Sequence, residues 1–350
     1  MLGRPQQEVC LRCHGGRADL DRAVAEGFLS PGSRPALLSS VLSMPSLHPV
    51  SSTAFGRGED REVVCTSCHS PHRSTPPGRG TANAEGNRYP SPMKADVLEL
   101  ELCEGCHGGL GVTTDSRLDV SRFFAPTNVS HHPVEAPASQ RSPSVKPNLA
   151  GRFVNCTDCH GSDDPSGARG LPGSRTHKLL SRSYTTVDGA GESEEAFALC
   201  YGCHARKAVL ESGAFPGHRK HIVDLKASCA TCHSGHGSIV NRALIRYGED
   251  ATFGSVAPSP KSGRLEFVST GPGSGSCYLL CHGRDHGPES YGTAKASGIP
   301  FRSTAASPRQ PSAGPVPSTG TPVRAPGPGV IPAPVRAPGD RQAPKLPDTP

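Results

Sequence analysis

The stretch Cys65-Thr66-Ser67-Cys68-His69-Ser70-Pro71-His72 contains the unit from which this 350-residue chain is built. All fourteen cysteines fall into pairs, and a histidine directly follows each pair. Six pairs enclose two residues and the last encloses three. Numbered one to seven, the units are Cys10-Cys13-His14, Cys65-Cys68-His69, Cys103-Cys106-His107, Cys156-Cys159-His160, Cys200-Cys203-His204, Cys229-Cys232-His233 and Cys277-Cys281-His282. This spacing is typical of covalent attachment of a c-type haem.

In such a unit the two thiols form thioethers to the vinyl groups of one porphyrin, and the adjacent imidazole binds the iron as its proximal ligand. The pattern therefore predicts seven haems, held by the fourteen cysteines and by the seven histidines that end the units. Zinc sites, iron–sulfur clusters and disulfides are the alternatives. None of these requires a histidine directly after the second cysteine.

Composition predicts a fold without a large polypeptide core. Only 34% of residues are hydrophobic, there is no Trp, and Gly (41) and Pro (36) are abundant. An ordinary domain is about 45–50% apolar, so we expect the haems themselves to supply the apolar core. We predict a mostly irregular chain packed around covalently bound haems, with few or no strands and short α-helices at residues 19–26, 96–106 and 192–211.

The units recur in a way that suggests duplication of a two-haem repeat. Units one, three and five each follow Val or Leu, and the interleaved units are two, four and six. We expect one repeat at 1–97 with haems one and two, a second at 98–195 with haems three and four, and a third at 196–295 with haems five to seven. The Pro-rich residues 296–350 are predicted to be a disordered tail.

Nine histidines lie outside the units and are candidates for the second axial ligand. They are His48, His72, His131, His132, His177, His218, His221, His236 and His286. Methionine is scarce, with three in the whole chain, so ligation by two histidines throughout is the economical interpretation, and it implies low-potential haems. His48, His132 and His221 share a Val-flanked context and are the first candidates. For His131, His177 and His218 a surface or supporting role is the alternative.

Three of the nine closely follow a unit. His72 and His236 come three residues after His69 and His233, and His286 comes four after His282. Three residues span at most about 11 Å, too little to place both imidazoles on opposite faces of one porphyrin. We therefore expect each of these histidines to bind a neighbouring haem. Unit four has no such histidine, and His177 is the substitute that we expect there.

Two stretches carry a resemblance to a known family. The stretch Cys65-Thr66-Ser67-Cys68-His69-Ser70-Pro71-His72, followed by Leu100-Glu101-Leu102-Cys103-Glu104-Gly105-Cys106-His107, resembles the doubled CxxCH-motif multihaem c-type cytochromes. Ala230-Thr231-Cys232-His233-Ser234-Gly235-His236 looks like a second copy of the first half. The resemblance covers residues 10 to about 286 and is carried by the units. It implies an exported electron carrier, and some members of that family polymerise into extracellular filaments.

We therefore predict a heptahaem cytochrome that relays electrons between other redox proteins and a periplasmic or extracellular acceptor. The alternatives are a multihaem reductase of nitrogen or sulfur compounds with one open iron, and a subunit of a cytochrome filament or porin–cytochrome conduit. The sequence has no run of eighteen apolar residues, so it predicts no membrane-spanning helix. Because no leader precedes Cys10, we expect either that the natural start lies upstream or that this is a processed or truncated chain. The net charge of +6 does not indicate nucleic acid, since haem propionates would offset it.

Overall fold

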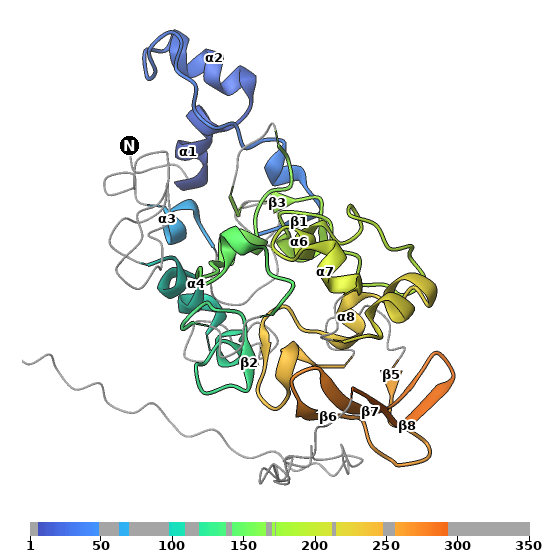
Figure 1. The fold of residues 1–350 in the computed structure, drawn as a ribbon. Helices are drawn as coiled ribbons and strands as arrows, with labels where there is room; N and C mark the ends of the chain where they lie inside the picture. Colours follow the sequence, from blue (N-terminus) through green and yellow to red (C-terminus); the bar gives the residue numbers. More distant parts are fainter. Residues whose placement is uncertain are drawn as a thin grey trace, which may run out of the picture. The chain divides into compact units, whose positions relative to one another are not determined.

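A computed structural model describes residues 6–48, 63–69, 98–108, 119–137, 142–165, 170–171, 173–211, 215–247 and 256–292. These residues belong to one compact unit of the chain, Met1–Ile299 (Figure 1). His72 and the tail expected at 296–350 lie outside the described residues.

Six of the seven cysteine–histidine units form helical turns. Units one and three end the helices α1 (Gln6–His14) and α4 (Glu99–His107), and unit five continues from the end of α6 (Ala198–Tyr201). Units two, four and six begin one-turn helices, which are α3 (Cys65–Cys68), α5 (Cys156–Cys159) and α8 (Cys229–Cys232). Residues three apart share one face of a helix. Each of these turns therefore presents its two thiols side by side.

Small polar residues start the one-turn helices. Ser67 Oγ accepts a hydrogen bond from the Val64 backbone N–H at 3.1 Å, and Ser228 Oγ accepts one from Ala230 at 3.1 Å. The first N–H groups of a helix have no partner within the helix, so these oxygens supply one. A single turn is too short to persist alone. The residues between and before the cysteines thus stabilise the conformation that pairs the thiols.

Two short antiparallel pairs join segments that are distant in the sequence. β1 (Ser46–Leu47) pairs with β3 (Gly173–Ser174), and β2 (Ser130–His131) pairs with β4 (Gly237–Ser238). The turns η1 (Val41–Ser43) and η2 (Ser121–Phe123) precede β1 and β2, whereas η4 (His177–Leu179) and η6 (Arg242–Leu244) follow β3 and β4. The same small arrangement therefore occurs twice in the fold.

The two copies repeat an individual hydrogen bond. Ser46 Oγ accepts from the backbone N–H of Leu179 at 2.8 Å, and Ser130 Oγ accepts from that of Leu244 at 2.9 Å. Each serine thus connects the first strand of its copy to the turn that follows the second strand. This correspondence makes the histidine after β1 the structural equivalent of the histidine after β2.

The expectation of few or no strands is wrong. Besides the two short pairs, β5 (Val256–Ala257), β6 (Glu266–Gly271), β7 (Ser274–Cys281) and β8 (Arg284–Tyr291) form a four-stranded antiparallel sheet (Figure 1). β7 pairs with each of the other three strands. Unit seven therefore lies on a strand and not on a helix.

The physical reason is that several residues in this segment prefer the strand conformation strongly enough to outweigh the preference of neighbouring Gly and Ser for loops. Phe267, Val268 and Tyr278 are aromatic or β-branched, and such residues favour a pleated, half-buried surface. Gly271-Pro272-Gly273 and His282-Gly283 supply the two turns. The abundance of Gly and Ser favours loops only where no such residues alternate with them.

The helices expected from the sequence have counterparts with different bounds. α2 (Arg17–Ala25) corresponds to 19–26, and α4 corresponds to 96–106. The stretch 192–211 forms two helices, α6 and α7 (Arg206–Glu211), with unit five between them. Two further short helical turns are η3 (Pro147–Leu149) and the π-helical η5 (Arg219–Asp224).

Side chains form only small hydrophobic clusters. The larger one contains Phe197, Tyr201, Leu210 and Ile222, with Phe197 only 1% exposed. It holds α6, α7 and η5 together beside unit five. In the part of the chain that the structure describes, no helix has the length and apolar character needed to cross a membrane.

Candidate haem-binding site

A cavity of about 2740 Å³ runs through the described part of the chain. Pockets for one small molecule typically measure about 300–1,000 Å³, so this cavity has room for several large cofactors. Cysteines and histidines of units three to seven line it. Seven of the nine additional histidines also line it, namely His48, His131, His132, His218, His221, His236 and His286. Units one and two and His177 are not part of this lining.

Consecutive units lie beside one another in the order of the sequence. Burial and, after it, the neighbouring Cys10 raise the pKa of Cys65 to about 11. Burial and then Cys203 raise the pKa of Cys159 to about 12. The other neighbouring thiols are Cys68 with Cys103, Cys103 with Cys156, Cys200 with Cys229, and Cys232 with Cys281. The attachment points thus form one continuous series from unit one to unit seven.

Buried carboxylates fix the positions of neighbouring units. Glu99 of α4 is 4% exposed, and its Oε1 accepts hydrogen bonds from the backbone N–H and Oγ1 of Thr157 at 2.8 and 2.9 Å. Thr157 lies between the two cysteines of unit four. Asp188 Oδ1 in the same way accepts from Ser228 N–H and Thr231 Oγ1 at unit six. Sequence spacing gave no sign of these contacts, because the partners lie 58, 40 and 43 residues apart.

Histidine rings face one another in pairs across the cavity. The ring centres of His48 and His107 are 6.2 Å apart, as are those of His160 and His236. The pair His218 and His233 has a separation of 6.1 Å, and the pair His221 and His286 one of 6.4 Å. The rings of His160 and His236 are nearly parallel, at 7°, and the other three pairs are tilted by 42–56°.

The same separations match two imidazoles bound to opposite sides of one metal ion. A metal–imidazole bond of about 2.0–2.1 Å, plus roughly 1.1 Å from the nitrogen to the ring centre, places two such ring centres about 6.3 Å apart. Three of the four pairs join the histidine of a unit, His107, His160 or His233, to a histidine from elsewhere in the chain. The residues present therefore fit haem iron with two axial histidines.

The orientation of the rings favours the same chemistry. The Nδ1–H of His48 donates to the Leu171 carbonyl at 3.1 Å, and that of His233 donates to the Ala243 carbonyl at 2.7 Å. Histidines that bind metal usually donate the other ring N–H to such an acceptor, which leaves the free nitrogen for the metal. His14, His131, His132, His160, His218 and His221 also donate Nδ1–H to a backbone carbonyl.

Burial keeps several of these imidazoles neutral. It lowers the pKa of His204 to about 4, and His132 and His233 nearby lower it in the same direction. Burial followed by His233 likewise lowers the pKa of His218 to about 4. A neutral imidazole offers the lone pair that a metal requires.

His132 lies beside the histidine of unit five, as its effect on the pKa of His204 indicates. It follows β2 just as His48 follows β1, so the two copies of the small arrangement place equivalent histidines beside units three and five. His204 Nδ1 lies 2.7 Å from Ser144 Oγ. Sixty residues separate Ser144 from His204, and no sequence signal identified this partner.

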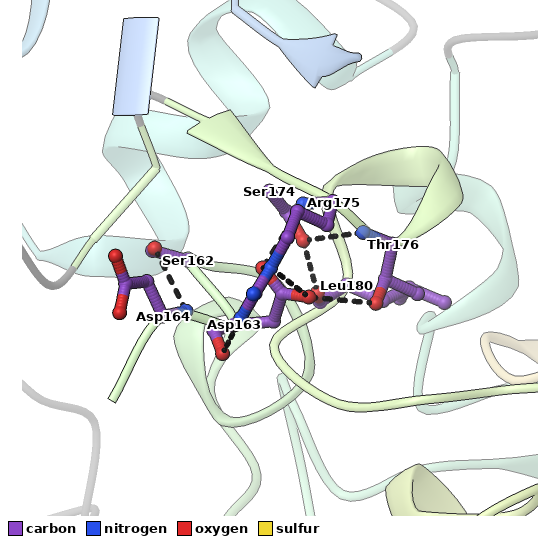
Figure 2. A network of polar contacts seen from close by, with 7 residues as sticks. All are labelled: Ser162, Asp163, Asp164, Ser174, Arg175, Thr176 and Leu180. Carbon is purple, nitrogen blue, oxygen red and sulfur yellow. Dashed lines mark hydrogen bonds and ion pairs between the residues drawn. The ribbon is translucent and has the colours of Figure 1, made fainter. Parts of the chain in front are cut away.

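The structure gives unit four a second candidate ligand besides the expected His177, whose turn η4 lies against His160. His236 makes the ring pair with His160, whereas His177 begins the turn η4. At the position three residues after His160, where unit six has His236, this unit has Asp163 (Figure 2). Asp163 Oδ1 accepts from the Arg175 backbone N–H at 2.9 Å, and Oδ2 accepts from Thr176 Oγ1 at 3.3 Å. This network ties unit four to β3.

Unit seven departs most from the helical units. Four residues along a strand, at about 3.4 Å each, separate the Cα atoms of Cys277 and Cys281 by about 14 Å. His282 lies in the turn after β7, and its Nε2 is 3.2 Å from Asp188 Oδ2. The nitrogen that would bind iron is thus beside a carboxylate.

No family model, curated protein or solved structure matches this chain. Within the described ranges, no three side chains of His, Cys, Asp and Glu converge in a way that could hold a bare metal ion. The assignment of the site therefore depends on the units, the ring pairs and the cavity.

Proposed function

We propose that the protein is a multihaem c-type cytochrome that relays electrons through bis-histidine haems. The observation that carries this proposal is the combination of two arrangements, an ordered series of cysteine pairs and the histidine ring pairs in the cavity. The attachment cysteines follow one another in sequence order, and histidine rings face each other at 6.1–6.4 Å. Bound haem supplies reversible one-electron chemistry at its iron.

The cysteines of each unit attach the cofactor. Each thiol would add to one vinyl group of the cofactor, with its sulfur bound to one vinyl carbon and its hydrogen transferred to the other, so that no atom is lost. A helical turn with both thiols on one face suits this reaction on two vinyl groups of one porphyrin. Six units have that conformation.

The histidines would hold the iron, and the acceptors at Nδ1 fix the orientation of rings such as His48 and His233. These acceptors raise the basicity of the ligating nitrogen and so favour the oxidised, more positive state of the metal. Two histidines on an iron would leave it no open position for a substrate. We therefore propose an electron-transfer role and not catalysis on a small molecule.

The remaining expectations extend this proposal. Covalent haem attachment implies that the protein acts outside the cytoplasm, in the periplasm or beyond the cell surface, with other redox proteins as donor and acceptor. The series of units offers an entry at unit one and an exit at unit seven, or the reverse. Docking of a partner near either end would suit such a role.

A spectroelectrochemical titration of the haem-loaded full chain tests the function. We expect only low-spin spectra, midpoint potentials below those of His/Met haems, and no binding of carbon monoxide or nitrite by the reduced protein. A variant with Cys156→Ser and Cys159→Ser serves as a control and should lose one haem. Stoichiometric nitrite binding followed by turnover would contradict the proposal and indicate an enzyme.

A further inference from the structure

Unit seven lies in a β-hairpin in which one face carries both cysteines. Cys277, Leu279 and Cys281 alternate along β7 and so point to the same side of the sheet. His286 on β8 pairs directly with Leu279, and residues opposite one another in an antiparallel pair share a face. His286 is thus placed between the two cysteines on their own side of the hairpin.

His282, which ends unit seven, has a different environment. With Gly283 it forms the two-residue turn between β7 and β8, and both residues have positive φ, +49° and +77°. This backbone is that of a tight hairpin turn. The side chain is 38% exposed, and its Nε2 lies 3.2 Å from Asp188 Oδ2. Asp188 is itself held by Ser228 and Thr231 of unit six, so His282 connects the hairpin tip to that unit.

A partner ring faces His286 from another element. The centres of His286 and His221 are 6.4 Å apart, close to the 6.1–6.2 Å of the three pairs that include a unit histidine. His221 lies in η5 and donates its Nδ1–H to the Gly217 carbonyl at 2.7 Å. Its other nitrogen therefore remains available for a metal.

The surroundings of this pair suit a porphyrin. The ring of Phe215 lies 5.7 Å from that of His221 and 4.6 Å from that of Tyr291 on β8. His286 has a 13% exposed side chain, and the Glu289 carboxylate lies 3.9 Å from its Nδ1. An aromatic ring thus borders His221, and the side chain of His286 is largely buried.

We propose that the seventh iron is bound axially by His221 and His286, and that His282 is a positioning residue that fixes the hairpin tip through Asp188. This inference rests on the proposed function and deepens it, because it assigns ligands to a unit whose strand conformation departs from the other six. The unit would then use a histidine from the opposite strand in place of the one that directly follows its cysteines.

Carbon monoxide titration of the reduced, haem-loaded full chain tests the assignment on single variants. His286→Ala and His221→Ala should each create one five-coordinate haem and so bind one equivalent more than the unsubstituted chain. His286→Met should keep that iron six-coordinate and raise the midpoint potential of a single haem, since Met ligation raises potentials. His282→Asn is the matched control, and it should bind no additional carbon monoxide.

The converse results overturn the assignment. Additional carbon monoxide binding by His282→Asn would show that His282 is a ligand, and no additional binding by His286→Ala or by His221→Ala would show that the substituted histidine is not one. The tryptic peptide Leu265–Arg284 contains both cysteines of unit seven, and it should carry one haem by mass in the unsubstituted protein. A haem-loaded chain in which this peptide is unmodified would refute the seventh site alone. A chain without any haem would instead refute the proposed function.

Discussion

The imidazole of His236 faces the imidazole of His160 at 6.2 Å between ring centres, with an angle of only 7° between the ring planes. His236 lies three residues after the histidine of unit six, yet it is paired with the histidine of unit four. His236 can thus connect units four and six, because a short loop joins it to unit six while its ring is paired with the histidine of unit four. Such connections would hold neighbouring haems at a short and fixed separation.

Substitution of His236 should leave one haem iron without its second histidine ligand. We expect His236→Ala to bind one equivalent more carbon monoxide than the unsubstituted chain when reduced, because haem four would lose its second ligand. A carbon monoxide titration followed by absorption spectroscopy measures this change. His177→Ala is the control, since His177 does not line the cavity, and it should bind no more than the unsubstituted chain. Additional binding by the His177 variant with none by the His236 variant would reverse the assignment.

Removal of the hydroxyl beside His204 should alter one haem only. Ser144→Ala removes the oxygen 2.7 Å from His204 Nδ1, which makes the imidazole a weaker electron donor. We expect the midpoint potential of one haem to rise and the free energy of unfolding to fall by about 0.5–1.5 kcal/mol. Ser43→Ala removes a serine hydrogen bond to Ser40 outside the cavity and should leave every potential unchanged. Redox titration of both variants distinguishes these outcomes.

Two glycines close to the ring pairs should respond differently to alanine. A Cβ on Gly237 would collide with the backbone carbonyl oxygen of Phe123, whereas a Cβ on Gly235 would meet no atom within 4 Å. Gly237→Ala should therefore separate β2 from β4 and lower the midpoint of thermal unfolding. Gly235→Ala should leave it nearly unchanged. Equal effects of the two substitutions would show that the β2–β4 contact does not form.

The carboxylate of Glu192 should make stability depend on pH. Its side chain is 3% exposed, and it accepts hydrogen bonds from Arg206 and from Tyr201 Oη. The Arg206 hydrogen bond is the main cause of a lowered pKa for Glu192, and burial opposes it. A lowered carboxylate pKa stabilises the fold above the unfolded value of about 4.3, and this contribution is lost as the pH falls through the folded-state pKa.

The test compares Glu192→Gln with the unsubstituted chain. At neutral pH we expect the variant to be less stable by about 1.5–3 kcal/mol, the usual value of a hydrogen bond to a charged group. Below pH about 4.3 the difference should shrink. Denaturant unfolding followed by the haem absorption provides the measurement. The exposed Glu195 gives the control Glu195→Gln, which should show no pH-dependent difference.

The sequence predicted the local conformation of each cysteine–histidine unit better than it predicted which histidines pair with one another. Spacing of three residues between Cys156 and Cys159 is enough to predict thiols on one face of a turn, because it depends on one helical turn alone. The partner of His160 could not be predicted in this way. It depends on the β2–β4 pair, which brings residues 130–131 beside 237–238, and two-residue strands leave no periodic pattern in a sequence.

The sheet at residues 256–291 shows a different limit. Phe267, Val268 and Tyr278 carried a strand signal, but the many glycines and serines around them favoured a loop. The histidine directly after Cys281 was expected to be a ligand because the six other units have one there. The hairpin turn changes the direction of the chain at His282, and only the three-dimensional arrangement shows that His286 lies on the face of the cysteines.

Mass measurement of the intact chain, produced in a cell that attaches c-type haem, tests the central claim most directly. We predict a red protein with seven haem adducts and no free thiol among the fourteen cysteines. A colourless protein with fourteen free thiols, or one with zinc bound to them, would contradict this account.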